Sequence, residues 1–391
     1  MNQSIYFDNA ATSFPKPPGV LEAMVSYGRE IGASAGRGTY SQAVEAGEII
    51  HQTRRNLAKL IGAAENDHII LTFNCTDSLV LAIKGIITDG DAHVITTCMD
   101  HNSVLRPLHA LQEQLGIEVT YISADGEGFI DPNDVRRAVR GNTKLIAMIH
   151  GSNVCGVIQD IKAVGEIARE LGITYLVDAA QTAGHLPINV QEIPVDLLAM
   201  PGHKGLLGPL GTGALYIRKE LENQLQPIRE GGTGSRSESP IQPDFLPDRF
   251  ESGSHNLHGI AGLQAGIAYL LKESVDKVRA DEMELCSAFL EDLSDIPGLK
   301  VYGPKDPEKR VGVFSVTIEG YEPTELSAIL EERFNLLTRP GLHCAPLAHK
   351  SLGTLEGGGT TRFSTGPFTS LDEVQYATEA LAQISYTHIH I

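Results

Sequence analysis

Lys204 lies in a segment whose neighbours would keep it away from water. It stands in the run MPGHKGLLGPLGTG, beside His203 and among glycine, proline and apolar residues, just before a predicted strand. Burial lowers the pKa of a lysine, and the neutral amine can then form a Schiff base with an aldehyde. A solvated surface lysine is the ordinary alternative, but the apolar surroundings favour the reactive form.

Asp178 ends a predicted buried strand in the run YLVDAAQTAGH. A buried carboxylate is costly unless it has a partner. One interpretation is a helix cap or turn residue. The other is an anion that keeps a heteroaromatic nitrogen protonated, as an aspartate does for the pyridine ring of pyridoxal phosphate.

Cys344 is the cysteine best placed for chemistry. It lies in TRPGLHCAPLAHKSLG, where proline and glycine predict a loop, with Arg339 and His343 close by in sequence. Nearby cations favour the thiolate, which is the nucleophilic form. Cys286 lies on a predicted helix and fits a small buried apolar residue better. The thiols of the other four cysteines are interpreted as structural.

Three further sites are weaker signals when taken singly. Arg362, in GGGTTRFSTGPF, could bind a carboxylate through two parallel hydrogen bonds or form a surface salt bridge. His101, in MDHNS, is either a buried core histidine or a flat ring that stacks on a cofactor and relays protons. Asn74, Cys75 and Thr76 stand at a strand-to-helix junction, where free backbone N–H groups can bind a phosphate.

The hydrophobic pattern predicts the elements that position these residues. Between about 68 and 218, short apolar runs alternate with helix-period stretches, which is typical of βαβ units and a mostly parallel sheet. A long amphipathic helix is expected to begin at Ser41. The expected strands are 68–73, 93–98, 117–122, 143–150, 173–178 and 213–218, and the expected helices between them are 75–87, 103–115 and 160–171.

Four polar clusters follow the ends of predicted strands. They read NCTDS, MDHNS, HGSN and DAAQ. Ligands of open α/β sheets bind beyond the carboxyl ends of the strands. The sequence therefore predicts one site assembled from separate loops at a single edge of the sheet.

The last part of the chain predicts a second, smaller α/β unit. Residues 229–256 are rich in Gly, Ser and Pro and are interpreted as a long functional loop. The elements expected after this loop are helices at 259–272, 274–295, 323–333 and 371–385 and strands at 311–318 and 334–338.

Composition excludes several classes of partner. The formal net charge of −18 argues against binding nucleic acid or an anionic membrane, both of which require clustered Lys and Arg. The five cysteines show neither a disulfide framework nor a metal-binding spacing. We expect no signal peptide, because the basic start and apolar stretch are missing, and no apolar run of the ~20 residues needed to span a bilayer. These features predict a cytoplasmic protein without a metal site.

Together these residues resemble the class V aminotransferase fold of pyridoxal-phosphate enzymes, and within it the cysteine desulfurase and selenocysteine lyase family. The resemblance runs from YFDNAAT to RFSTGPF, and its most specific pieces are VDAAQ with its following histidine, GHKG and RPGLHCAP. It implies fold type I, with an N-terminal segment (1–20) that packs on the small domain, a large cofactor-binding domain (21–258) and a small domain with the catalytic cysteine (259–391).

The resemblance also implies a role for each candidate residue. It assigns the Schiff base and proton transfer to Lys204, and attack on the sulfur of L-cysteine to Cys344, which leaves a persulfide and alanine. Arg362 would bind the substrate carboxylate, and Ser254 would reach the cofactor phosphate of a second subunit in a homodimer. The remaining implied contacts are Asp178 on the ring nitrogen, Gln181 and Asn153 on the ring hydroxyl side, His101 on the ring face, and Cys75, Thr76 and His203 on the phosphate, with Asn153 also near the substrate.

The sequence departs from the family pattern at three positions. Pro201 replaces a serine that precedes the His-Lys pair, His255 replaces a proline, and Leu342 replaces the first histidine before the cysteine. The cysteine loop is short and anchored by proline, which in this family is typical of enzymes accelerated by a sulfur-acceptor protein.

Other activities remain open on the same fold. They are selenocysteine lyase, cysteine-sulfinate desulfinase, C–S lyase and aminotransferase, and a non-catalytic scaffold is a further alternative. A nucleotide-binding dehydrogenase is disfavoured, because no GxGxxG motif lies between a first strand and helix.

Overall fold

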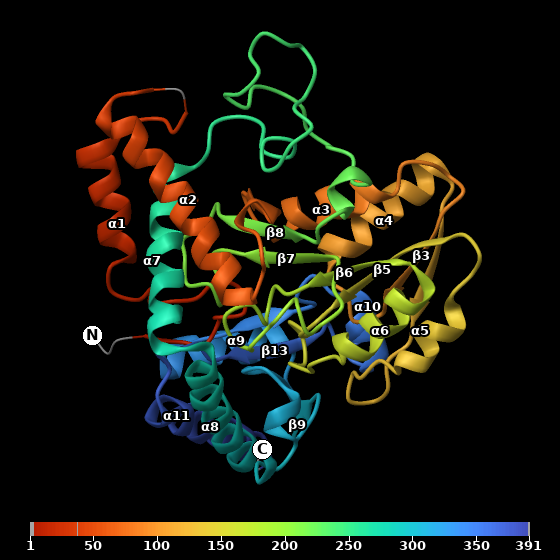
Figure 1. The fold of residues 1–391 in the computed structure, drawn as a ribbon. Coiled ribbons are helices and arrows are strands. Elements are labelled where there is room, and N and C mark those ends of the chain that lie inside the picture. Colours follow the sequence, from red (N-terminus) through yellow and green to blue (C-terminus); the bar gives the residue numbers. More distant parts are fainter. Residues whose placement is uncertain (1–3, 37, 390–391) are drawn as a thin grey trace.

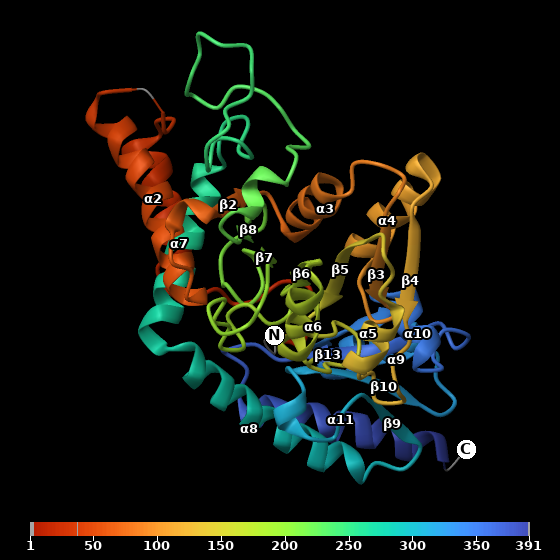
Figure 2. The same cartoon turned by 45° about the vertical axis from the view of Figure 1, so that its right-hand side comes forward.

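A computed structural model describes residues 4–36 and 38–389 of the chain. A central sheet lies between two layers of helices, and a second, smaller group of strands and helices from the C-terminal part lies beneath it (Figure 1). Figure 2 shows the same arrangement from the side, with the smaller group along one end of the central sheet.

The central sheet has seven strands. They are β2 (Ile69–Thr72), β3 (His93–Thr97), β4 (Glu118–Ile122), β5 (Thr143–Ile149), β6 (Thr174–Asp178), β7 (Leu197–Pro201) and β8 (Gly213–Ile217). Their order is β2-β8-β7-β6-β5-β3-β4. β8 runs antiparallel to both neighbours, whereas the pairs from β7 to β4 are parallel. The predicted mostly parallel sheet is confirmed.

Alternate residues of each strand enter two separate cores. In β5, Ile146 and Met148 join one core, while Leu145 and Ala147 join the other, as the two-residue period of a strand requires. The first core is covered by α2 (Ser41–Ile61), α5 (Pro132–Ala138), α6 (Ile161–Leu171) and α7 (Leu257–Glu273), and the second by α3 (Cys75–Ile86) and α4 (Asn102–Leu115).

The six predicted strands of this sheet are all present, and β7 is a strand that the pattern analysis missed. β7 reads LLAMP and is fully buried, so it lacks the alternation that marks a half-exposed strand. Its position matters, because the turn after Pro201 carries His203 and Lys204. With β7 in place, five strands deliver polar loops to the same edge of the sheet.

The C-terminal part forms a second sheet with the order β12-β13-β10-β9. Its strands are β9 (Leu299–Tyr302), β10 (Val313–Ile318), β12 (Arg339–Gly341) and β13 (Thr360–Ser364), and its helices are α8 (Val275–Ser294), α9 (Pro323–Phe334), α10 (Pro346–Ser351) and α11 (Leu371–Ile389). Neighbouring strands are antiparallel. β12 leads directly into the loop of Cys344, so this sheet positions the cysteine.

The N-terminal segment joins the two parts. β1 (Ile5–Tyr6) pairs in parallel with β11 (Leu336–Leu337) of the C-terminal part, and Phe7 packs in the core of that part. α1 (Val20–Ser26) instead packs against α7, as does α2. The domain boundaries at residues 20 and 258 stay predictions.

Residues 229–256 form an irregular loop that stands out from the body of the molecule beside α2 and α7 (Figures 1 and 2). No helix in the described part of the chain combines the length and the apolar character needed to cross a membrane.

Candidate active site

A cavity of about 270 Å³ opens at the carboxyl edge of the central sheet. Its walls come from the N-terminal segment, from the loops after β2, β3, β5, β6 and β7, and from the β12–β13 region. The residues predicted from sequence that line it are Cys75, Thr76, His101, Asn153, Asp178, Gln181, His203, Lys204, Cys344 and Arg362. The structure therefore brings ten of the eleven candidate residues together, from segments far apart in the sequence.

Lys204 lies in a compact turn held by the N-terminal segment. Ser13 donates a hydrogen bond from its hydroxyl to the Lys204 carbonyl (3.0 Å), and Ser13 N–H and Lys16 Nζ both donate to the His203 carbonyl (3.0 and 2.9 Å). Burial lowers the pKa of Lys204, although Cys75 and Asp178 oppose this shift. A lysine with a lowered pKa is suited to Schiff-base formation.

Asp178 lies at the end of β6 and is 2% exposed. Its Oδ1 accepts a hydrogen bond from Ala180 N–H (2.9 Å) and one from the Cys75 thiol (3.5 Å). Burial raises the pKa of Asp178 and raises that of Cys75 well above its ordinary value. A cationic N–H group in the cavity would offset the cost of ionising this carboxyl.

The amino end of α3 faces the cavity beside His101. Asn74 caps α3 by accepting a hydrogen bond from Asp77 N–H (2.9 Å), and the Thr76 and Ser103 hydroxyls are 2.7 Å apart. His101 Nδ1 accepts from Ser103 N–H (3.1 Å), so the ring carries its proton on Nε2. Burial lowers the pKa of His101 to about 4, with Lys204 adding to the shift, and the ring is neutral at pH 7.

Several buried polar atoms around the cavity lack a partner among the described residues. They are Asn153 Oδ1, His203 Nδ1 and Arg362 Nε. Buried polar groups without partners are rare in native proteins and indicate a ligand or an ion. An anionic, aromatic aldehyde fits this set, because the helix amino end suits a phosphate, Asp178 suits a ring N–H and Lys204 suits the aldehyde.

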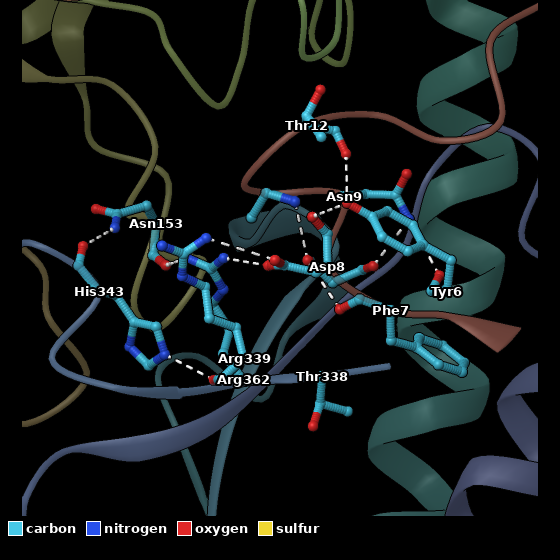
Figure 3. Close-up of polar contacts among 12 residues, drawn as sticks. Tyr6, Phe7, Asp8, Asn9, Thr12, Asn153, Thr338, Arg339, His343 and Arg362 are labelled. Carbon is cyan, nitrogen blue, oxygen red and sulfur yellow. Dashed lines mark hydrogen bonds and ion pairs between the residues drawn. The ribbon is translucent and has the colours of Figure 1, made fainter. Parts of the chain in front are cut away.

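Arg362 projects from β13 and is 3% exposed. Its guanidinium donates to Asp8 Oδ1 (2.6 Å) and to the Asn153 carbonyl (3.0 Å), while Arg339 lies 3.5 Å from the other Asp8 oxygen. Figure 3 shows the two guanidiniums side by side, both directed toward the Asp8 carboxylate. Arg362 is therefore already held by one carboxylate, with Nε still free to donate. Sequence analysis did not assign a role to Asp8, whose partners lie at the opposite end of the chain.

Cys344 is exposed at the mouth of the cavity. Its carbonyl accepts a hydrogen bond from Asn102 N–H (2.8 Å), and the carbonyl of the preceding His343 accepts from Asn153 Nδ2 (2.7 Å). His343 and Cys344 both have positive φ angles, 49° and 56°. The thiol is thus presented by a short, closely held loop.

Ser254 is the candidate residue that does not line this cavity. It is exposed and borders a separate depression with Phe73, Gly211 and Arg229. The unusual His255 next to it contacts the buried Glu251 through Nε2 (2.6 Å). Of the other two departures from the family pattern, Pro201 ends β7 and lines the cavity, and the Leu342 carbonyl accepts from Ala345 N–H (2.9 Å).

Sequence reasoning missed the residues that support the site from behind. The His203 carbonyl is held by Lys16, the Cys344 carbonyl by Asn102 and the His101 ring by Ser103. The sequence gave no sign of these contacts, apart from the position of Ser103 at the amino end of α4. Among the described residues, no group of three or more His, Cys, Asp or Glu side chains is arranged to hold a metal ion.

Comparisons with known proteins give the same picture over almost the whole chain. A family model described as aminotransferase class-V matches residues 5–377. A probable cysteine desulfurase of Methanothermobacter thermautotrophicus is 34% identical over 388 residues, which is 98% of this chain and 96% of that protein. A probable cysteine desulfurase of Pyrococcus abyssi is 36% identical over 378 residues, which is 95% of this chain and 92% of that protein.

The solved structures include a similar fold. The apo structure of a cysteine desulfurase from Thermococcus onnurineus NA1 matches with a TM-score of 0.92 at 34% identity, over 99% of this chain and 96% of that one. Because the family model and these relatives match nearly end to end, the chain belongs to the class-V aminotransferase family of pyridoxal-phosphate enzymes.

Proposed function

We propose that this protein is a pyridoxal-phosphate-dependent cysteine desulfurase, which converts L-cysteine to L-alanine and transfers the sulfur to Cys344 as a persulfide. The observation that carries the proposal is the placement of Lys204, Arg362 and an exposed thiol, Cys344, around one cavity. A lysine and an arginine alone would suit many amino-acid reactions. The thiol supplies the nucleophile that sulfur transfer requires. The relatives named cysteine desulfurase support the same reaction.

The cofactor would be held by residues from several loops. Asp178 would pair with the ring N–H, Gln181 and Asn153 would face the ring hydroxyl, and His101 would lie on the ring face. Cys75, through its backbone, Thr76 and His203 would hold the phosphate at the amino end of α3. When bound, pyridoxal phosphate withdraws electrons from Cα of the amino acid attached to it.

Lys204 has two tasks in this proposal. Its amine would hold the cofactor aldehyde in the resting enzyme and would move the proton at Cα of the bound substrate. Burial, which lowers the pKa of Lys204, keeps a larger fraction of the amine unprotonated and so able to accept that proton. The neutral His101 nearby can donate a hydrogen bond from Nε2.

Arg362 would orient the substrate by its carboxylate. Its free Nε lies in the buried part of the cavity wall, and the guanidinium offers further N–H groups beyond those that Asp8 and Asn153 use. Binding at this position would direct the side chain of L-cysteine toward the mouth of the cavity, where Cys344 lies.

Cys344 would perform the sulfur step. Its thiolate attacks the sulfur of the bound L-cysteine, a new S–S bond forms and the Cβ–S bond breaks. The electron pair of the broken bond stays on Cβ, which takes up a proton, so that alanine leaves and Cys344 retains a persulfide. Cys344 lies on the surface side of the cavity, which would allow a second protein to collect the sulfur.

We infer a homodimer from two features outside the cavity. Ser254 is exposed away from its own cavity, which fits a contact with the cofactor of a second copy. Large apolar side chains are exposed on α1, on the start of α2 and in three segments outside the helices and strands, and exposed apolar surface is typical of interfaces. They are Phe14, Leu21, Val25, Val44, Leu210 and Ile241.

The remaining proposals concern the cellular setting. A sulfur-acceptor protein would dock over the exposed Cys344 loop. A cytoplasmic location would suit an exposed catalytic thiol, because a reducing compartment keeps it free.

The reaction is tested by comparing wild type with Cys344→Ala and Lys204→Ala. We expect a yellow wild-type protein that forms alanine and sulfide from L-cysteine with a reductant. Cys344→Ala should stay yellow and lose alanine formation, and Lys204→Ala should lose both the Schiff-base absorbance and turnover. Full alanine production by Cys344→Ala would refute the desulfurase and favour a lyase or aminotransferase.

A further inference from the structure

The peptide that presents Cys344 has a backbone conformation that its residues do not favour. His343 and Cys344 are consecutive non-glycine residues with φ angles of 49° and 56°. A positive φ is unfavourable for such residues because of contacts between Cβ and the backbone. Such a conformation persists only where the surroundings restrain it strongly. The contacts that restrain this pair therefore bear on where the thiol lies.

Two hydrogen bonds to the backbone carbonyls of the pair hold it in place. Asn153 Nδ2 donates to the His343 carbonyl (2.7 Å), and Asn102 N–H donates to the Cys344 carbonyl (2.8 Å). His343 is 7% exposed, and Figure 3 shows its ring directed toward the Arg339 backbone. Its Nε2 contacts the Arg339 carbonyl at 2.9 Å, so the imidazole is not committed to the Cys344 thiol.

The His343 ring continues into a chain of buried polar side chains. His343 Nδ1 lies 3.2 Å from His349 Nε2, and His349 Nδ1 lies 2.7 Å from the Thr354 hydroxyl. His349 is completely buried and Thr354 is 4% exposed. The Thr354 N–H also donates to the His349 carbonyl (2.8 Å), which closes the turn after α10.

One arrangement of protons satisfies all three contacts of the chain when both rings are neutral. The Arg339 carbonyl only accepts, so His343 must carry its proton on Nε2, and its Nδ1 must accept. His349 must then donate from Nε2, which leaves its Nδ1 as an acceptor. Any other pair of tautomers sets two lone pairs or two protons against each other. Thr354 must therefore donate its hydroxyl proton to His349 Nδ1 (2.7 Å), which lies closer to the hydroxyl than its other acceptor, the His349 carbonyl (3.3 Å).

The charges near this row of hydrogen-bonded side chains favour the neutral forms of the His343 and His349 rings. Arg362 and Arg339 lie on the side of His343, and Arg362 also acts on His349. Burial and both guanidiniums lower the pKa of His343 to about 3, and burial together with Arg362 lowers the pKa of His349 to about 4. Both rings thus keep the directed chain of hydrogen bonds at pH 7.

We propose that His349 and Thr354 are positioning residues for the sulfur step: through the His343 ring, the Thr354 hydroxyl fixes the strained backbone that aims the Cys344 thiol into the cavity. The proposal rests on the proposed function for the role of Cys344. Neither residue touches the substrate. Thr354, at the far end of the chain, stands outside the cavity lining.

The test uses an isosteric pair at position 354 in the holoenzyme. Thr354→Val removes the hydroxyl donor and keeps the shape, whereas Thr354→Ser keeps the donor. We expect Thr354→Val to lower kcat for alanine formation about tenfold, which is the effect of losing about one hydrogen bond, with KM for L-cysteine nearly unchanged. Thr354→Ser should retain most of kcat.

A second readout separates positioning from general damage. Exchange of the Cα proton of L-alanine in D2O, followed by NMR, depends on Lys204 and the cofactor and not on Cys344. It should be the same in wild type, Thr354→Val and Thr354→Ser. A parallel fall in Cα exchange and alanine formation would overturn the proposal, as would equal kcat values for the valine and serine variants. If Thr354→Val fails to fold, His349→Gln, which keeps a donor toward His343, is compared with His349→Leu in the same assays.

A third readout does not depend on the reaction. Amide hydrogen exchange of the segment 339–354, measured by mass spectrometry, should be faster in Thr354→Val than in wild type or Thr354→Ser, with the central sheet unchanged. Unchanged exchange in that segment would contradict the positioning role. Failure of the proposed function would instead appear as alanine formation that survives in the Cys344→Ala variant.

Discussion

Charged side chains in the site are arranged in pairs whose members come from distant parts of the chain. Asp8 holds the buried Arg362 and lies near Arg339, and Asp178 lies close to the lysine turn. Motifs identified Asp178 at a strand end, Lys204 in a distinctive turn and Arg362 between a glycine run and a following turn. They did not identify the role of Asp8, since an ion pair across more than 350 residues leaves no local pattern.

Asp8 is expected to set how well Arg362 binds the substrate. Asp8→Asn removes the charge from a 2.6 Å contact and leaves two guanidiniums without their shared carboxylate. Loss of one charge-assisted hydrogen bond should loosen Arg362 and raise KM for L-cysteine by about tenfold, with a smaller effect on kcat. Steady-state kinetics measure this. A lower KM would show that Asp8 competes with the substrate for Arg362 and does not hold it in place.

Among the elements, the strand ends that carry the site residues were largely predictable from the sequence. The close contacts between segments that also shape the site were not. The predicted strands of the central sheet and the helices after them are present. They could be predicted because their apolar runs and helical periods are long enough to be recognised in the sequence. β7, β12 and β13 were missed, because they are short or fully buried. The close contact between the β12 and β13 segments, which leads into the Cys344 loop, involves two glycines.

Gly359 should tolerate no side chain. It has a φ of +101°, and a Cβ at this position would lie 2.1 Å from the Gly341 carbonyl oxygen. Gly359→Ala should lower the free energy of unfolding by about 1–3 kcal/mol and reduce turnover through the Cys344 loop. Urea unfolding and the alanine assay measure the two effects.

Gly357→Ala is the matched control. An added Cβ there meets no atom closer than 3.9 Å, and the residue has no positive φ. Its free energy of unfolding should stay within about 0.5 kcal/mol of wild type. Equal losses of unfolding free energy and turnover in Gly359→Ala and Gly357→Ala would show that the close contact between β12 and β13 does not determine the conformation of the Cys344 loop.

For the whole molecule, buried histidines link stability to pH. Burial lowers the pKa of His150 and of His349 to about 4, well below the value of an unfolded chain. As pH falls below about 6.5, the unfolded state takes up protons that the folded state does not. Stability supplied by these neutral rings is complete above that pH and is lost toward pH 4. Asp100 acts in the opposite direction, because burial raises its pKa to about 7.

The predicted result is a falling free energy of unfolding between pH 6.5 and 4, with each buried histidine contributing a slope of about 1.4 kcal/mol per pH unit. His150→Leu should remove one such contribution. Circular dichroism during urea unfolding is the suitable probe, because the chain has no Trp. An identical slope for wild type and His150→Leu would contradict the assignment.

The most direct test of the account is the identification of the sulfur that Cys344 receives. The holoenzyme is incubated with L-cysteine, without reductant, quenched by alkylation and analysed by peptide mass spectrometry. The account predicts one added sulfur atom on the peptide containing Cys344, formed in step with alanine and absent from Lys204→Ala. Alanine release with no added sulfur on Cys344, or with the sulfur on Cys75 instead, would contradict the central claim.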